Sequence, residues 1–283
     1  MDDATEISAP VCYRHPDRVT GLSCTRCGRS ICVECSHDAA VGQLCPECAE
    51  PNDRHRVVTR RQIIGRPSFA TAPVSLGIIA FTAVIYLIGA LSPEAERWLF
   101  ITLAQFNVLI GAGEWWRIFS AALLHASVMH ILFNMYALYL FGPRLEQQVG
   151  SPAFAALYLA SAGAGGAAAY VLLGTTSTTP LVGASGAIFG LFGAWIFVAW
   201  KMRNTPGGRS MFTNLMVLLG INLALPLFVP NIAWEAHMGG LAAGFAIAYL
   251  WSLLAVGKPN AVGIRTAIAT AVIALDLAIV LIV

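Results

Sequence analysis

Two residues of the kind that carry out nucleophilic chemistry lie inside strongly apolar segments. Ser185 is the third residue of the sequence GASG (183–186), and His237 is the second residue of AHMGG (236–240). A serine becomes a nucleophile at neutral pH when a neighbouring base takes its proton, and histidine is a common base. Polar residues are costly inside a membrane unless a partner satisfies them. The sequence therefore predicts a Ser185–His237 pair within the membrane.

A third apolar segment contributes two more polar side chains. His130 and Asn134 are four residues apart, so they lie on the same side of a helix. A tetrahedral intermediate needs hydrogen-bond donors aimed at its oxyanion. The backbone N–H of Ser185, the amide of Asn134 and the imidazole of His130 are candidate donors. The alternative is an ordinary packing face in which Ser185 bonds a carbonyl group. Four such residues at matching depths favour the catalytic interpretation.

The elements that must position these residues are hydrophobic helices. Of the 283 residues, 57% are hydrophobic and 11% are charged, whereas charged residues make up about a quarter of soluble domains. Seven mostly apolar stretches are long enough to span a bilayer: 73–91, 120–141, 152–174, 182–200, 211–229, 233–256 and 264–283. Glycines at helical spacing, such as Gly240 and Gly244, would let these helices approach closely. We expect an all-α polytopic membrane protein.

The charges divide the chain and orient it. Residues 1–66 hold nine of the 15 acidic residues, nine of the 17 basic residues and all seven cysteines. With the N-terminus inside, the outer side receives only Arg97 and Arg117, and the other basic residues fall on the inner side. The positive-inside rule thus predicts a cytoplasmic N-terminus and an outer C-terminus. The outer connection, 92–119, is too apolar for a solvated loop, so we expect short helices in the membrane interface.

In their order along the chain, these motifs resemble those of the rhomboid intramembrane serine proteases. The resemblance covers about residues 70–256 and rests on Trp116-Arg117 in the outer connection, His130 and Asn134 in the second span, Gly183 to Gly186 around Ser185 in the fourth, and His237, Gly240 and Gly244 in the sixth. It implies a six-helix core, to which 264–283 adds a seventh helix. The single acidic residue well inside a span, Asp276, lies in that helix, and we expect it to be a packing residue.

The resemblance also implies roles for individual residues. Ser185 would be the nucleophile and His237 the general base of a dyad, with His130, Asn134 and Gly183 around the oxyanion. Trp116 and Arg117 would be structural elements of the outer loop. Phe189 stands where many relatives carry a tyrosine that stacks on the catalytic histidine. The implied substrates are membrane proteins with a transmembrane helix, and no metal is needed for the chemistry.

The polar N-terminal segment contains four ligand pairs with two intervening residues, a spacing typical of zinc sites. Eight ligands suffice for two tetrahedral Zn²⁺ ions, both structural because protein fills every position. The 8-, 4- and 9-residue gaps resemble a B-box-type finger, and that resemblance implies two alternating sets: Cys12, His15, Cys32 and Cys35, and Cys24, Cys27, Cys45 and Cys48. His37 is a spare ligand. A disulfide scaffold is disfavoured, since the head is expected to be cytoplasmic and the cysteine count is odd.

These observations predict four parts: a zinc-binding domain (1–50), a basic linker along the inner leaflet (51–70), the rhomboid core (71–256) and the seventh helix (257–283). The head would serve partner docking or regulation, and its balanced charges argue against nucleic acid. High alanine and glycine usage indicates a bacterial plasma membrane. The main rival is a non-proteolytic rhomboid-like protein that binds client helices. A transporter is disfavoured because inverted-repeat halves with paired broken helices are not visible.

Overall fold

The computed structural model describes residues 10–39, 42–49, 67–228 and 232–283. The chain divides into two units, Met1–Arg66 and Pro67–Val283, which are described separately. Most of the predicted linker, 51–66, lies outside the described residues. The domain boundaries given above stay predictions.

The N-terminal unit has little regular structure. Its elements are a 3₁₀ turn η1 (Val33–Cys35), an antiparallel pair β1 (His37–Asp38) and β2 (Gln43–Leu44), and a single helical turn α1 (Pro46–Ala49). Its buried centre consists of five cysteines and Ile31. So few apolar side chains cannot offset the entropy of ordering the chain, and domains of this size usually depend on metal ions or disulfides.

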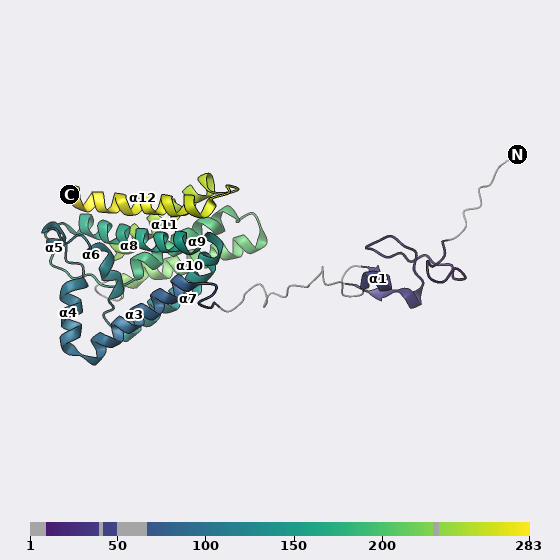
Figure 1. Ribbon diagram of the computed structural model, residues 1–283, viewed down its shortest axis with the longest axis horizontal. Helices are drawn as coiled ribbons and strands as arrows, with labels where there is room; N and C mark the ends of the chain where they lie inside the picture. Colours follow the sequence, from purple (N-terminus) through teal and green to yellow (C-terminus); the bar gives the residue numbers. More distant parts are fainter. Residues whose placement is uncertain (1–9, 40–41, 50–66, 229–231) are drawn as a thin grey trace. The chain divides into compact units, whose positions relative to one another are not determined.

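Within its described residues, the second unit contains helices and loops and one isolated antiparallel β-bridge, between Gln105 and Leu181 (Figure 1). Its elements, in chain order, are α3 (Pro73–Leu91), α4 (Pro93–Leu103), α5 (Asn107–Gly111), α6 (Arg117–Ser120), η3 (Ala121–Leu123), α7 (Val128–Val149), α8 (Ser151–Leu173), α9 (Ser185–Lys201), α10 (Pro206–Ala224), η4 (Leu225–Leu227), α11 (Trp234–Leu254) and α12 (Ala261–Ile282). The expected fold class, a polytopic all-α protein behind a small cysteine-rich head, is confirmed.

Five helices among the described residues are long and apolar enough to span a membrane, or six if one bent pair counts as one span. The bent pair corrects the predicted second span. We expected one helix over 120–141, but Arg117–Leu123 and Val128–Val149 meet at a bend of 100°. Ser127 explains the break, because its hydroxyl accepts the N–H of His130 and caps a new helix. The predicted fourth span, α9, is a shorter apolar helix of 17 residues.

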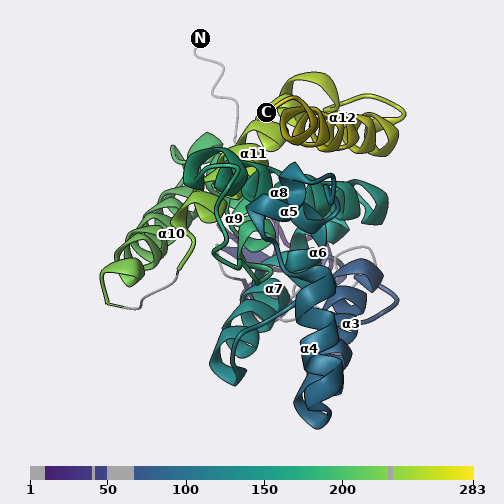
Figure 2. The ribbon, with the colours of Figure 1, turned by 90° about the vertical axis from the view of Figure 1, so that its left-hand side faces the viewer.

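Helices α8, α9 and α11 form the centre of the unit. Helix α11 packs extensively on α9 and α8, and α12 packs mainly on α8 and less closely on α11. Figure 2 shows α12 at one margin of the bundle and α3 and α4 at another. Glycines permit the tight contact between α9 and α11: a methyl group on Gly240 would lie 2.0 Å from the carbonyl oxygen of Gly186, and one on Gly244 would lie 1.9 Å from that of Gly190. These helices therefore touch backbone to backbone, as predicted.

This contact predicts a large effect of adding one carbon atom. Gly244→Ala should destabilise the fold by about 1–3 kcal/mol or more, because backbone atoms cannot move aside as a flexible side chain can. Gly220→Ala in α10 is the matched control, since a methyl group there meets nothing within 4 Å. Thermal unfolding of the purified protein in detergent measures both changes. Equal melting temperatures for the two variants would contradict the close contact.

Polar side chains fasten the outer connection to the bundle. The buried Arg117 donates to the carbonyl oxygen of Ile101 at 2.9 Å and forms an ion pair with Glu114. Asn107 reaches α8, where its amide donates to the carbonyl oxygen of Ala169 at 3.1 Å. The connection contains the short helices α4, α5 and α6, as expected. Unlike the buried Arg117, the neighbouring Trp116 has 40% of its surface exposed. The depth of these helices in the membrane stays a prediction.

Candidate active site

The segment before α9 is held in place by backbone hydrogen bonds. The N–H of Gln105 donates to the carbonyl oxygen of Leu181 at 3.0 Å, and the N–H of Gly183 donates to that of Ala121 at 2.9 Å. Gly183 has a φ of +130°, a conformation that side-chain-bearing residues rarely adopt. These contacts fix the approach to α9, whose first residue is Ser185.

Ser185 and His237 lie within hydrogen-bonding distance. The Oγ atom of Ser185 is 2.8 Å from the Nε2 atom of His237, which lies in the first turn of α11. Both residues are partly buried. In the described part of the chain, no carboxylate hydrogen-bonds to the imidazole of His237. A neutral Nε2 at this distance can take the serine proton, so the pair has the geometry of a nucleophile and its base.

An aromatic ring fixes the orientation of this base. The ring of Phe189, one helical turn after Ser185, is stacked on the imidazole with 4.2 Å between centroids and 8° between planes. Phe189 is buried, and it also contacts the ring of Phe192 edge-on. The ring face expected at this position is therefore present without a phenol hydroxyl.

This stacking predicts a graded response to substitution. Phe189→Leu keeps apolar volume but removes the ring face, and it should lower kcat about 2- to 10-fold, because aromatic pairs contribute about 0.5–1.5 kcal/mol beyond burial. Phe189→Tyr keeps the face and should stay within about twofold of wild type. Steady-state cleavage of a single-span substrate measures both. A tyrosine variant as slow as the leucine variant would contradict the stacking role.

The imidazole of His130 borders the other side of the serine loop. A methyl group on Gly183 would lie 2.8 Å from the Nε2 atom of His130 and 3.7 Å from the Oγ atom of Ser185, so both groups face this glycine. The amide of Asn134, which is buried, donates to the carbonyl oxygen of His130 at 2.9 Å. The structure thus gathers His130 and Gly183 around Ser185, with Asn134 one helical turn behind His130. Their oxyanion roles stay predictions.

Three buried polar residues with structural contacts were not singled out from the sequence. The carboxylate of Glu146 in α7 accepts the N–H groups of Val74 and Ser75 and so caps α3. Gln105 and Asn107 bond carbonyl groups of α8. The signal that the sequence offered for these residues was an acidic or amide side chain within an otherwise apolar segment. Asp276 is 3% exposed and faces Gly163 of α8, and its Oδ2 atom makes no hydrogen bond within the described residues, so its packing role stays a prediction.

The N-terminal unit brings its eight expected ligands together as two groups of four: Cys12, His15, Cys32 and Cys35, and Cys24, Cys27, Cys45 and Cys48. All ligand atoms within each group lie within 4.8 Å of one another. The Sγ atoms of Cys27 and Cys45 are 3.8 Å apart, close to the ~3.8 Å that a tetrahedral zinc with Zn–S bonds of about 2.3 Å requires. The donor sets therefore fit metal ions. His37 is exposed and belongs to neither group.

In each group of four, local hydrogen bonds favour the thiolate form of at least one cysteine, whereas burial and neighbouring thiols raise the pKa of Cys35 to about 11. Burial raises the pKa of the Cys12 thiol, but hydrogen bonds from the backbone amides of Arg14 and Cys32 outweigh it and lower the pKa to about 6. The pKa of Cys24 is likewise about 6, because backbone amides, those of Cys45 and Cys27 foremost, outweigh burial. Each group of four thus offers a thiolate at neutral pH.

Comparison with known proteins links this geometry to one family. The Rhomboid domain family matches residues 112–253. Rhomboid protease GluP of Bacillus subtilis (strain 168) is 35% identical over 215 residues, which cover 76% of this chain and 40% of the relative. Putative rhomboid protease YdcA of the same organism is 36% identical over 182 residues, or 63% of this chain and 88% of the relative. RHOMBOID-like protein 5 of Arabidopsis thaliana is 34% identical over 145 residues, which cover 50% of this chain and 46% of the relative.

Proposed function

Because the chain belongs to the rhomboid family, we propose that it is an intramembrane serine endopeptidase that cleaves transmembrane segments of membrane proteins. The observation that carries this proposal is the 2.8 Å contact between Ser185 Oγ and His237 Nε2. The stacked Phe189 supports it. Two of the relatives are named as rhomboid proteases, one of them putatively, and the chain spans only 40% of the length of the first.

The proposed reaction has two halves. Ser185 Oγ attacks the scissile carbonyl carbon while its proton moves to His237 Nε2, and the oxyanion forms beside His130 and Asn134. The C–N bond then breaks, the leaving amine takes the proton from His237, and an ester to Ser185 remains. Water attacks this ester in the same way, with His237 as base, and releases the acid and the free serine.

The substrate class follows from the burial of the site. A peptide bond inside a transmembrane helix is shielded by the helix's own hydrogen bonds, which must open before Ser185 can attack. We therefore propose substrates whose spans carry small or helix-destabilising residues near their outer end.

The test is cleavage of a purified single-span substrate reconstituted with the full chain in liposomes. Mass spectrometry of both fragments should place the cut within or near the span. A folded protein that co-purifies with uncut substrates would instead support the alternative, a rhomboid-like protein that binds client helices. Removal of residues 1–66 separates this alternative from a protease that is inhibited by its N-terminal unit. If the shortened protein cleaves the substrate, the N-terminal unit inhibits the protease. If it still binds the substrate without cleaving it, the protein binds client helices.

For the head we propose two structural Zn²⁺ ions in a B-box-type arrangement and a role in docking a cytoplasmic partner or in regulation. The two groups of four ligands support the ions. The protein is a multi-pass membrane protein with bacterial rhomboid relatives. The distribution of basic residues supports an N-terminus in the cytoplasm and a C-terminus outside, and the bacterial relatives support placement in a bacterial plasma membrane.

A further inference from the structure

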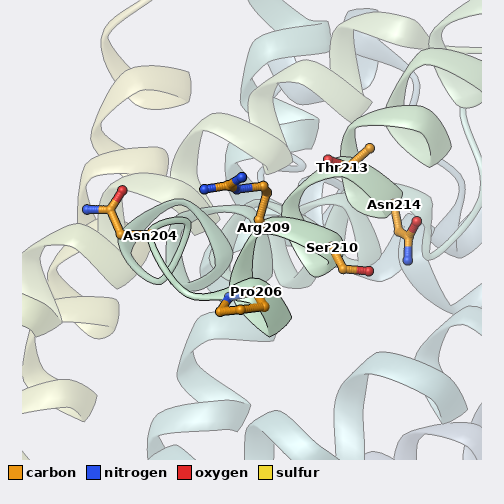
Figure 3. A pocket seen from close by; sticks show the side chains of 6 residues that line it. All are labelled: Asn204, Pro206, Arg209, Ser210, Thr213 and Asn214. Atoms are coloured by element: carbon orange, nitrogen blue, oxygen red, sulfur yellow. The ribbon is translucent and has the colours of Figure 1, made fainter.

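An open surface cavity of about 480 Å³, lined only by exposed residues, lies at the start of α10. Helix α9 begins with Ser185 and ends at Lys201, shortly before α10, so the cavity lies at the opposite end of α9 from the proposed catalytic pair. Figure 3 shows the six side chains that line it, which are Asn204, Pro206, Arg209, Ser210, Thr213 and Asn214. Five of the six are polar.

The polar side chains form two neighbouring rows on the first turns of α10. Arg209 and Thr213 are four residues apart, as are Ser210 and Asn214, so each pair shares a face of the helix. All four residues are exposed, and from Leu215 onward the helix is almost entirely apolar. The cavity therefore lies where a membrane span passes into a polar region. Among the five helices that qualify as spans, α10 has the smallest buried share, so lipid can reach it.

The side chain of Arg209 has no partner in the described part of the protein, whereas the other basic side chains nearby contact aromatic rings. Arg203 donates to the carbonyl oxygen of Trp200 at 2.9 Å and lies over the Trp200 ring, and Lys201 lies over the ring of Phe197. Within the described residues, Arg209 and the four other polar side chains of the cavity make no hydrogen bond or ion pair with the protein. The segment 201–228 contains no aspartate or glutamate. One cation with several neutral donors and no acid is a set suited to an anion.

We propose that this cavity binds the phosphate of an anionic phospholipid headgroup, with Arg209 as the cation and Ser210, Thr213 and Asn214 as hydrogen-bond donors. A guanidinium group binds phosphate through paired, charge-assisted hydrogen bonds. The positive-inside rule assigns this end of α10 to the cytoplasmic side, where the leaflet is anionic. The apolar face beyond Leu215 would lie beside the acyl chains. Binding here would hold the start of α10 at the level of the headgroups.

Lipid binding to the full-length protein tests this proposal without any need for protease activity. Native mass spectrometry in a neutral detergent would titrate phosphatidylglycerol, phosphatidylcholine and inorganic phosphate. We expect wild type to prefer phosphatidylglycerol and Arg209→Gln to weaken its binding about tenfold, as loss of a charge-assisted hydrogen bond does. Arg203→Gln, which removes a neighbouring cation of the same type, should stay within about twofold. Thr213→Val, which keeps shape and charge, should weaken binding a few-fold.

Three results would overturn the assignment. Equal losses in Arg209→Gln and Arg203→Gln would mean general attraction between the basic surface and anionic lipid. Unchanged binding in Arg209→Gln would mean that the cavity takes no part. Inorganic phosphate binding as tightly as phosphatidylglycerol would identify a site for free phosphate and not for lipid.

Discussion

Ser185→Ala is expected to lower the rate of substrate cleavage by on the order of 10⁴-fold or more, because it removes the hydroxyl that would form the ester intermediate. His237→Ala should cost about as much, since the serine hydroxyl would keep its proton at neutral pH. A contact of 2.8 Å joins the two side chains, and we expect them to act as one unit in the reaction. The double variant should therefore be no slower than either single variant. Cleavage in liposomes under single-turnover conditions measures all three.

Ser161→Ala is the matched control for this experiment. Ser161 is a fully buried serine of the neighbouring helix α8, and its hydroxyl makes no hydrogen bond within the described residues. Its removal should leave the rate within about twofold and the melting temperature unchanged or higher, since an unpartnered buried hydroxyl is unfavourable. If Ser185→Ala cleaves at the wild-type rate while folded, the proposed nucleophile is wrong. If the losses in cleavage rate of the two single variants multiply in the double variant, the two residues do not act as a coupled pair.

Removal of metal is expected to unfold the N-terminal unit. Structural zinc in small domains contributes an apparent ~10–16 kcal/mol at neutral pH, and the buried centre of this unit is built almost entirely from cysteines. We expect two zinc ions per chain by elemental analysis. Cys12→Ser and Cys24→Ser should each lose one ion, because their ligands belong to different groups. A chelator should expose the unit to limited proteolysis while the helical unit stays intact.

The two histidines of the described head provide a matched pair for this test. His15 Nδ1 lies 3.4 Å from the Sγ atoms of both Cys32 and Cys35, whereas His37 is exposed on β1. His15→Ala should weaken one zinc site by orders of magnitude, and His37→Ala should retain both ions. Loss of zinc from His37→Ala comparable to that from His15→Ala would show that the ligand set is wrong.

The sequence predicted the helices that hydropathy and charge define. Residues 73–91 form α3 as expected, and the predicted sixth span, 233–256, differs from α11 by only a few residues at its ends. The contact between Ser185 and His237 was also predictable, because each residue lies near the expected outer end of its span. Residue type and spacing carry this information without any knowledge of long-range packing.

Features that depend on partners distant in the sequence were not predictable. The bend before Val128 separates two apolar segments, and hydropathy alone joins them. The role of Glu146 depends on the N-terminus of α3, which lies over 70 residues earlier in the chain. The positive φ of Gly183 and its contact with the His130 ring likewise need the folded loop. Local sequence gives no measure of such contacts.

The enclosure of α9 has a consequence for how the protein responds to bilayer thickness. With 17 residues, this helix is about 26 Å long, shorter than the ~30 Å hydrocarbon core of a typical bilayer. A lipid-facing helix of that length would suffer hydrophobic mismatch. Nearly all of α9 is buried against other helices, whereas α3, α10 and α12 are largely exposed. We therefore expect a change in membrane thickness to alter the tilt of those outer helices first and to leave the support of Ser185 in place.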